Sequence, residues 1–247
     1  MTPVVVLTIA GSDSGGGAGI QADLKTFAAL GVFGVSVITA ITAQNTLGVT
    51  GVHAVPAAMV GAQLDAVLDD FEVAAVKVGM IPDREVALEV ARRIDRLPNL
   101  VVDPVLVATS GSRLAAVASV EPLLAYPSVV TPNHHEAAAL TGFEDAGQAA
   151  VALAGRGAGS VVVTGSESAV DVLHHDGVTT RLAGETVDTR NNHGSGCTFS
   201  SAIAVRLALG DDVPVAVRAA KTYVTNALRR GKDWKLGAGP GPLAHFG

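Results

Sequence analysis

Apolar, β-branched runs alternate with segments of helical periodicity along the whole chain, and this alternation is the strongest constraint on its fold. The runs at 4–10 and 100–102 are almost continuously apolar, as in strands that are buried on both faces. Such strands occur in parallel sheets whose crossover helices cover both faces. We therefore predict an α/β fold with a mainly parallel central sheet.

The expected elements follow one another with short connections. Strands are predicted at 4–10, 35–42, 74–78, 100–102, 129–131, 160–164, 170–174 and 178–182. Helices are predicted at 20–30, 57–71, 82–97, 133–140, 148–155, 197–209 and 213–230. The dipeptide Asp176-Gly177 indicates a hairpin turn between the last two strands. No linker or low-complexity segment interrupts the pattern, so residues 1–247 are predicted to form one domain.

Composition argues against several classes of function. The chain has 247 residues, of which 49% are hydrophobic, and a net charge of −6 without a basic cluster, which argues against a nucleic-acid partner. Mean hydropathy is +0.42, yet no apolar run reaches the roughly 18 residues of a membrane span. The first residues lack the basic region of a signal peptide. A single cysteine excludes an internal disulfide and fits the reducing cytoplasm.

A glycine-rich loop at 11–19 follows the first predicted strand. It lacks the Gly-Lys-Ser/Thr of a P-loop. Residues 17–22 match the loose dinucleotide-binding pattern, which needs an acid at the end of the next strand to bind a ribose. The next acid after the strand at 35–42 is Asp65, so a nicotinamide cofactor is disfavoured. We favour a backbone that closes around a small substrate, with a flexible turn as the alternative.

Three polar or soft side chains lie near that loop. Asp23, about one turn into the helix at 20–30, is either a solvated acid or a partner for an amino group or hydroxyl of a substrate. Gln44 either caps a turn or pairs with the edge of a heteroaromatic ring, because an amide both donates and accepts hydrogen bonds. Met80 is typical of core packing.

Acidic residues follow two later strands. Asp103 ends a very apolar run, where a carboxylate is costly to bury unless it is paired or bound to a cation. It either caps the next turn or contacts magnesium-bound phosphates. Asn133 and Glu136 begin a helix, as a capping pair would. The alternative is that Glu136 holds a water of a magnesium ion.

Cys197, the only cysteine, follows the small-residue turn Gly194-Ser195-Gly196 and precedes an apolar helix. Backbone N–H groups of such a turn point into one space, and the helix N-terminus adds partial positive charge. A phosphate can bind there, and we expect a thiol at this position to ionise more readily than a free one. Phosphoryl transfer is therefore the first hypothesis, and a buried, inert cysteine is the alternative.

Six segments in a fixed order carry the most specific signal. They are Thr8 to Asp23, Thr42 to Thr46, Asp103 to Val105, Thr131 to Asn133 with Glu136, His193 to Thr198, and Gly239 to Leu243 with His245 and Phe246. Together they resemble the hydroxymethylpyrimidine kinase and phosphomethylpyrimidine kinase family of thiamine biosynthesis, within the ribokinase-like superfamily. The resemblance covers nearly the whole chain.

The resemblance implies a fold, cofactors and a reaction. The implied fold is a ribokinase-like three-layer α/β/α sandwich that forms a single kinase domain, often as a homodimer. The implied cofactors are ATP and Mg²⁺. The implied reaction phosphorylates 4-amino-5-hydroxymethyl-2-methylpyrimidine to its monophosphate and then to its diphosphate.

The resemblance also implies roles for individual residues. The pyrimidine site would comprise Gly11, Asp23, Gln44, Met80 and Val107. The anion hole would comprise Gly194, Ser195, Gly196 and Cys197, with Cys197 as the base that faces the acceptor hydroxyl. The nucleotide would contact Asn133, Thr164, Gly165 and Asn192, and Glu136 with Asp103 would organise Mg²⁺.

The chain departs from the family pattern at several positions. Thr109 and Thr164 stand where lysines are usual, Asn192 replaces a threonine, and Ala238 replaces a histidine. Three alternative functions therefore remain open. They are a pyridoxal or pyridoxine kinase, a non-catalytic pyrimidine-binding module, and a nicotinamide oxidoreductase.

We expect the second phosphorylation to be slower than the first, because the missing lysines remove phosphate contacts. A charge-assisted contact contributes about 1.5–3 kcal/mol, so its loss slows transfer by about tenfold to a hundredfold. The second step has more anionic charge to neutralise and is affected most. Steady-state kcat/KM values on the alcohol and on the monophosphate test this expectation, which equal efficiencies would contradict.

Overall fold

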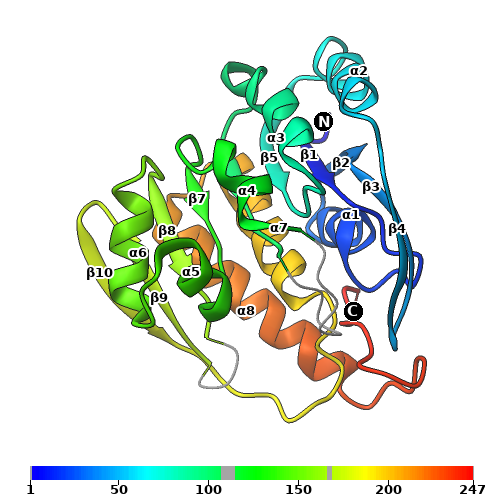
Figure 1. The fold of residues 1–247 in the computed structure, drawn as a ribbon. Coiled ribbons are helices and arrows are strands. Elements are labelled where there is room, and N and C mark those ends of the chain that lie inside the picture. Colours follow the sequence, from blue (N-terminus) through cyan, green and yellow to red (C-terminus); the bar gives the residue numbers. More distant parts are fainter. Residues whose placement is uncertain (1, 107–114, 166–168, 247) are drawn as a thin grey trace.

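The computed structural model describes residues 2–106, 115–165 and 169–246. Within these residues, the centre is an eight-stranded sheet in the order β10-β9-β8-β7-β6-β5-β1-β2 (Figure 1). The strands are β1 Val5–Ala10, β2 Phe33–Ile38, β5 Val73–Val78, β6 Leu100–Val102, β7 Val129–Val130, β8 Ser160–Val163, β9 Val170–His175 and β10 Val178–Ala183. Neighbours from β2 to β8 are parallel, whereas β9 and β10 form an antiparallel edge. The predicted mainly parallel sheet is confirmed.

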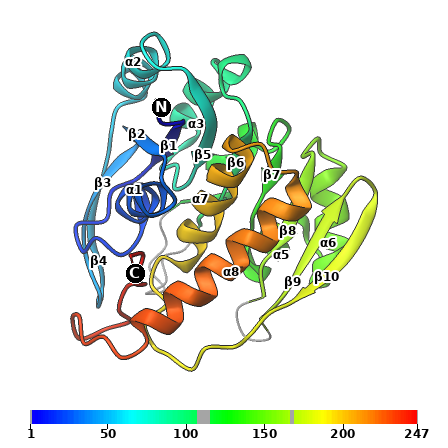
Figure 2. The same ribbon diagram turned by 180° about the vertical axis from the view of Figure 1, so that it is seen from behind.

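Helices cover both faces of this sheet and make three layers (Figures 1 and 2). One face carries α2 Ala57–Leu68, α3 Arg84–Ala91, α4 Val117–Val120, α5 His134–Thr141 and α6 Ala146–Ala154. The other carries α1 Gly19–Ala29, α7 Ser195–Ala208 and α8 Val213–Gly231. None of the helices in the described part of the chain combines the length and apolarity needed to span a bilayer.

The inner strands of the sheet supply both cores, because successive side chains point to opposite faces of a sheet. In β1, Val6 joins the core under α1 and α7, whereas Leu7 and Ile9 join the core under α2 and α3. All three side chains are fully buried. This double burial explains why the strands are continuous apolar runs in the sequence.

The strand predicted at 35–42 is wrong in its second half. The chain leaves the central sheet at Thr39, whose hydroxyl donates to the Met80 carbonyl at 2.7 Å. It then forms β3 Ala40–Asn45, which pairs with β4 Gly48–Ala54 in a separate antiparallel sheet of two strands. The run of mostly β-branched residues at 35–42 contains no glycine or proline, so the sequence pattern does not indicate this bend. β4 was missed because it is largely exposed and contains two glycines, so it has no apolar alternation.

Two further boundaries differ from the prediction. The helix predicted at 82–97 ends at Ala91 and is followed by a short 3₁₀ turn at Ile94–Arg96. It begins after Asp83, whose carboxylate accepts a hydrogen bond from the Val86 amide at 2.9 Å. Helix α4 and the 3₁₀ turn Glu121–Leu123 were not predicted.

The predicted hairpin between β9 and β10 is confirmed. Asp176 and Gly177 both have left-handed φ angles, +48° and +74°. A two-residue turn with both central residues in this region matches the twist of the flanking strands.

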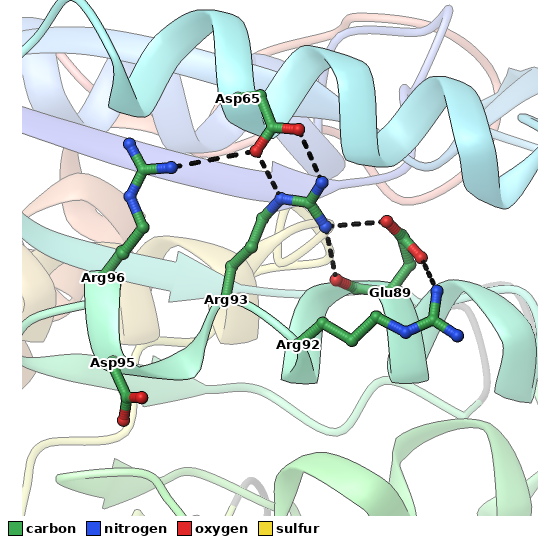
Figure 3. A pocket seen from close by; sticks show the side chains of 6 residues that line it. All are labelled: Asp65, Glu89, Arg92, Arg93, Asp95 and Arg96. Carbon is green, nitrogen blue, oxygen red and sulfur yellow. Dashed lines mark hydrogen bonds and ion pairs between the residues drawn. The ribbon is translucent and has the colours of Figure 1, made fainter.

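Paired charges tie α2 to α3 on the outside of the molecule (Figure 3). A hollow there is lined by Asp65, Glu89, Arg92, Arg93, Asp95 and Arg96. Arg93 donates two hydrogen bonds of 2.6 Å to Asp65 and one of 2.7 Å to Glu89. Arg92 and Arg96 have acidic partners as well. Arg93 and Arg96 therefore join the end of α3 to α2, whereas Arg92 pairs with Glu89 of its own helix.

Candidate active site

The carboxyl ends of the parallel strands share one edge of the sheet and carry most of the residues singled out from the sequence. Gly11 directly follows β1, Met80 lies two residues beyond β5, Asp103 directly follows β6 and Thr164 directly follows β8. Gln44 lies in β3, which leaves the same edge after β2. In open α/β sheets, ligands bind beyond this edge.

The turn before α7 meets this edge. Gly194 is the N-cap of α7, in the left-handed region at φ +84°, and a side chain there would collide with the Gly17 carbonyl oxygen at 1.9 Å. The amide of Ser195 donates to the Asn192 carbonyl at 3.1 Å. The amides of Gly196 and Cys197 have no acceptor within the described part of the chain. Free amides at a helix start are suited to bind an anion.

Cys197 lies in the first turn of α7 and is half-buried. Burial is the main reason why the pKa of its thiol is raised to about 12; the Lys77 ammonium lowers this pKa, and the carboxylates of Asp103 and Asp23 raise it. The expectation that this thiol ionises more readily than a free one is therefore wrong. Lost hydration outweighs the helix terminus and the lysine charge.

A fully buried ion pair lies beneath this turn. Lys77 Nζ is 2.9 Å from both carboxylate oxygens of Asp23. Thr8 Oγ1 and Ser201 Oγ donate to the same carboxylate at 2.6 and 2.7 Å. Ser201 is one helical turn beyond Cys197. The structure therefore places Asp23, predicted to contact a substrate, in a closed network without exposed surface.

The charge of Lys77 is maintained by its neighbours. Burial alone would lower the pKa of Lys77, but the nearby Asp23 carboxylate, with Asp103, raises it above its usual range. The side chain is thus a buried ammonium whose charge interacts with Cys197 and Asp103. Sequence reasoning missed it, although a lysine inside the apolar strand β5 was a visible signal.

Of the residues expected at a pyrimidine site, Gly11 and Met80 are in contact, and Gln44 is joined to the glycine-rich loop. A side chain on Gly11 would approach Met80 Sδ to 2.7 Å, so the two residues are in close contact. Gln44 Oε1 accepts a hydrogen bond from Thr42 Oγ1 at 3.3 Å, and the Gln44 side chain is partly exposed. Ser14 Oγ and the Gln44 backbone exchange two hydrogen bonds, which join the glycine-rich loop to β3. Val107, the remaining predicted contact, is outside the described residues.

Asn133 and Glu136 form the predicted capping box at the start of α5. The Glu136 amide donates to Asn133 Oδ1, and the Asn133 amide donates to Glu136 Oε2, both at 2.9 Å. The Leu106 amide donates to the other Glu136 oxygen at 3.2 Å. Asn133 also bridges to Thr164, so the ends of β7 and β8 lie side by side. Gly165 donates to Asp171 at 3.1 Å.

Among the described residues, two buried carboxylates at this edge have no compensating cation of their own. Burial raises the pKa of Asp103 to about 6, with Lys77 acting against it. Burial, with the charge of Asp103, raises the pKa of Glu136 to about 7. Thr131 lies between these two residues in the sequence. Its hydroxyl is buried and has no hydrogen-bond partner in the described part of the chain. A divalent cation with oxygen ligands would relieve this repulsion.

The site geometry agrees with the comparisons to known proteins. A model of the phosphomethylpyrimidine kinase family matches residues 13–244. The chain belongs to this family. It is therefore a phosphotransferase with the ribokinase-like α/β/α fold, and the nicotinamide oxidoreductase alternative is wrong.

Three relatives illustrate the match. A hydroxymethylpyrimidine/phosphomethylpyrimidine kinase of Rhizobium meliloti is 49% identical over 98% of this chain and 97% of its own length. A thiamine biosynthesis bifunctional protein of Geobacter sulfurreducens is 46% identical over 98% of this chain and 52% of its own. The ADP complex of Bacillus subtilis pyridoxal kinase superposes with a TM-score of 0.89 and 36% identity, covering 99% of this chain and 98% of that one.

We expect Lys77→Met to destabilise the protein by about 3–5 kcal/mol, because it leaves the Asp23 carboxylate buried without a partner. The double variant Lys77→Met/Asp23→Leu should recover most of this loss, since apolar groups can replace a buried ion pair. Denaturant unfolding measures both, with the exposed Lys232→Met as control. A single variant as stable as the parent would contradict this role of the pair.

Proposed function

We propose that this chain transfers the terminal phosphoryl group of ATP to the hydroxymethyl oxygen of 4-amino-5-hydroxymethyl-2-methylpyrimidine, and then a second one to the monophosphate, in thiamine biosynthesis. One kinase domain, residues 1–247, carries out both steps. The observation that carries this proposal is the start of α7 at the carboxyl edge of the sheet, where the amides of Gly196 and Cys197 have no acceptor among the described residues and Asp103 lies close to Gly196. The names of the relatives support the substrate class.

The amides of Gly196 and Cys197 bind the phosphoryl group during transfer. The acceptor oxygen forms a bond to the terminal phosphorus while the bond to the bridging oxygen breaks and ADP leaves. Charge on the transferred group is stabilised by these fixed donors and by the N-terminus of α7. Positioning and charge neutralisation supply most of the catalysis in phosphoryl transfer.

Cys197 orients the acceptor hydroxyl and, as its thiolate, takes the hydroxyl proton. The thiol, with a pKa of about 12, carries its own proton, so Cys197 takes the hydroxyl proton only after its own proton has left to solvent, and positive charge nearby favours that loss. The Lys77 ammonium beneath the turn supplies such charge. The hydroxyl proton leaves late in a loose transition state, so a strong base is not required before transfer begins.

Asp103 and Glu136 hold Mg²⁺ together with the phosphates of ATP. A magnesium ion usually has only one or two protein carboxylates and completes its shell with waters and phosphate oxygens. Within the described residues no group of three or more acidic, histidine or cysteine side chains is arranged to hold a metal ion. When bound, the ion neutralises phosphate charge.

The remaining contacts divide between the two substrates. The Gln44 amide reads the aminopyrimidine edge, with Gly11 and Met80 as the adjoining wall and Val107 as a further contact. Asn133, Thr164 and Gly165 contact the nucleotide at the ends of β7 and β8, and Asn192 contacts it at the turn. We assign Asp23 to holding Lys77 in place.

A kinase acting on pyridoxal is the second candidate function, favoured by the 36% identity to the Bacillus subtilis enzyme over 99% of this chain. Both substrates are hydroxymethylated aromatic heterocycles, so the polarity of the pocket does not separate them. An assay in which pyridoxal and the pyrimidine alcohol compete for the enzyme shows which of the two it phosphorylates preferentially. ATP turnover with either one excludes the third alternative, a non-catalytic pyrimidine-binding module.

We expect Cys197→Ala to lower kcat by about a hundredfold or more, as the loss of a positioned proton acceptor does. Cys197→Ser should retain part of the rate, since its hydroxyl can still orient the acceptor. Release of ADP with the alcohol substrate is the measurement, and a thermal melt shows that both variants fold. Full activity in both would remove the cysteine from the mechanism and leave the family assignment intact.

We also propose that the chain forms a homodimer through the exposed β3–β4 sheet, and that it acts in the cytoplasm, where Cys197 stays reduced. Ile41 on β3, Leu47 in the turn between the strands and Val52 on β4 are apolar and 55%, 68% and 46% exposed. A second copy of the chain could cover apolar side chains that are exposed in this way.

The variant Ile41→Lys should therefore shift the protein to monomers, because a charge at the interface opposes its burial. Light scattering after size-exclusion chromatography measures the mass. Val178→Lys, which replaces an apolar residue 63% exposed on β10, is the matched control. A monomeric parent, or an unchanged mass for Ile41→Lys, would contradict the proposal.

A further inference from the structure

An ion pair between β9 and α8 lies next to the end of β8. Asp171 of β9 is buried, and Lys221 Nζ of α8 lies 2.6 Å from its Oδ2. Asp171 faces the same side of the sheet as Leu173, because side chains two residues apart on a strand share one face. Leu173 belongs to the core under α7 and α8. Asp171 is thus an acid on an apolar face, where a charge needs a partner.

The other oxygen of Asp171 holds the backbone of Gly165. The Gly165 amide donates to Asp171 Oδ1 at 3.1 Å. The preceding amide, that of Thr164, donates to the Pro132 carbonyl at 2.9 Å. Because a peptide unit is planar, a fixed N–H also fixes the direction of the carbonyl that precedes it. The backbone at the end of β8 is therefore held by the segment after β7 and by Asp171.

Lys221 is itself held in a narrow space. Its ammonium also donates to the Ala169 carbonyl at 2.9 Å. Ala169 has a left-handed φ of +51°, a conformation that is strained for a residue with a Cβ. A side chain on Gly184, directly after β10, would lie 2.3 Å from Lys221 Cε. The ammonium therefore bridges the Asp171 carboxylate and a strained backbone, and the glycine leaves room for it.

We propose that Asp171, anchored by Lys221, is a positioning residue for the nucleotide, because it fixes the backbone at Thr164 and Gly165 against which ATP binds. The inference rests on the proposed function, in which these two residues contact ATP. Asp171 acts through the Gly165 amide rather than by touching ATP. A pair that only joined α8 to β9 would need no contact with Gly165, whereas here each carboxylate oxygen has a separate partner.

Steady-state kinetics on the full chain test the inference, with the pyrimidine alcohol and Mg-ATP as substrates. Asp171→Ala removes the acceptor of the Gly165 amide and should raise the KM for ATP by about tenfold or more, with the KM for the pyrimidine within about twofold of the parent. Asp171→Asn still offers a side-chain oxygen to this amide, so it should keep the KM for ATP within about threefold of the parent. Asp211→Ala is the matched control, because it breaks the ion pair with Arg206 at the other end of α7.

Two results would overturn the inference. One is a folded Asp171→Ala variant with the KM for ATP of the parent. The other is a KM for ATP that rises equally in Asp171→Ala and Asp171→Asn, which shows that the charge matters and the acceptor does not. If Asp171→Ala does not fold in a thermal melt, the double variant Asp171→Leu/Lys221→Met takes its place, because it removes the acceptor without leaving a buried charge unpaired.

Measurements on the parent chain separate this inference from the proposed function. A parent that phosphorylates the pyrimidine, with an unchanged KM for ATP in Asp171→Ala, removes only the role of Asp171. A parent that binds Mg-ADP without phosphorylating the pyrimidine removes the proposed function, and calorimetric Kd values of Mg-ADP for the same variants then decide the inference. A parent that binds no nucleotide overturns both.

Discussion

The buried Lys77–Asp23 ion pair is the contact on which the organisation of the site depends. Lys77 belongs to β5 and Asp23 to α1, while Thr8 of β1 and Ser201 of α7 donate to the same carboxylate. Four elements that are distant in sequence are thus joined at one point beneath the first turn of α7. A fully buried charge without its partner is very costly. The pair therefore favours the position of α7 on the sheet in which Ser201 can donate to Asp23.

The electrostatics of the carboxyl edge follow from this arrangement. One ammonium, Lys77, is surrounded by Asp23, Asp103 and the Cys197 thiol, and the first of these already occupies it. Burial is the main cause of the raised pKa values of Asp103, Glu136 and the Cys197 thiol, and the charge of Lys77 only partly offsets it at Asp103 and Cys197. We propose that a divalent cation bound together with the phosphates of ATP would offset this negative charge.

Local patterns in the sequence were sufficient for much of the fold. The capping box of Asn133 and Glu136, the hairpin turn at Asp176-Gly177 and the apolar strands are all short-range signals, and each appears in the structure. The division of the run at 35–42 between two sheets was not predictable, because Thr39 bends the chain through a bond to the distant Met80 carbonyl. The roles of the predicted site residues remain proposals.

By itself, the sequence determined the family, the fold class and the edge of the sheet at which the site lies, because strand type, glycine turns and caps are encoded within a few residues of one another. Only the tertiary structure decided which charges are buried together. Asp23 turned out to be a partner of Lys77, Asp13 a partner of His193, and Cys197 a protonated thiol. These outcomes depend on desolvation and on partners 54 to 180 positions away in the chain, which no local pattern reports.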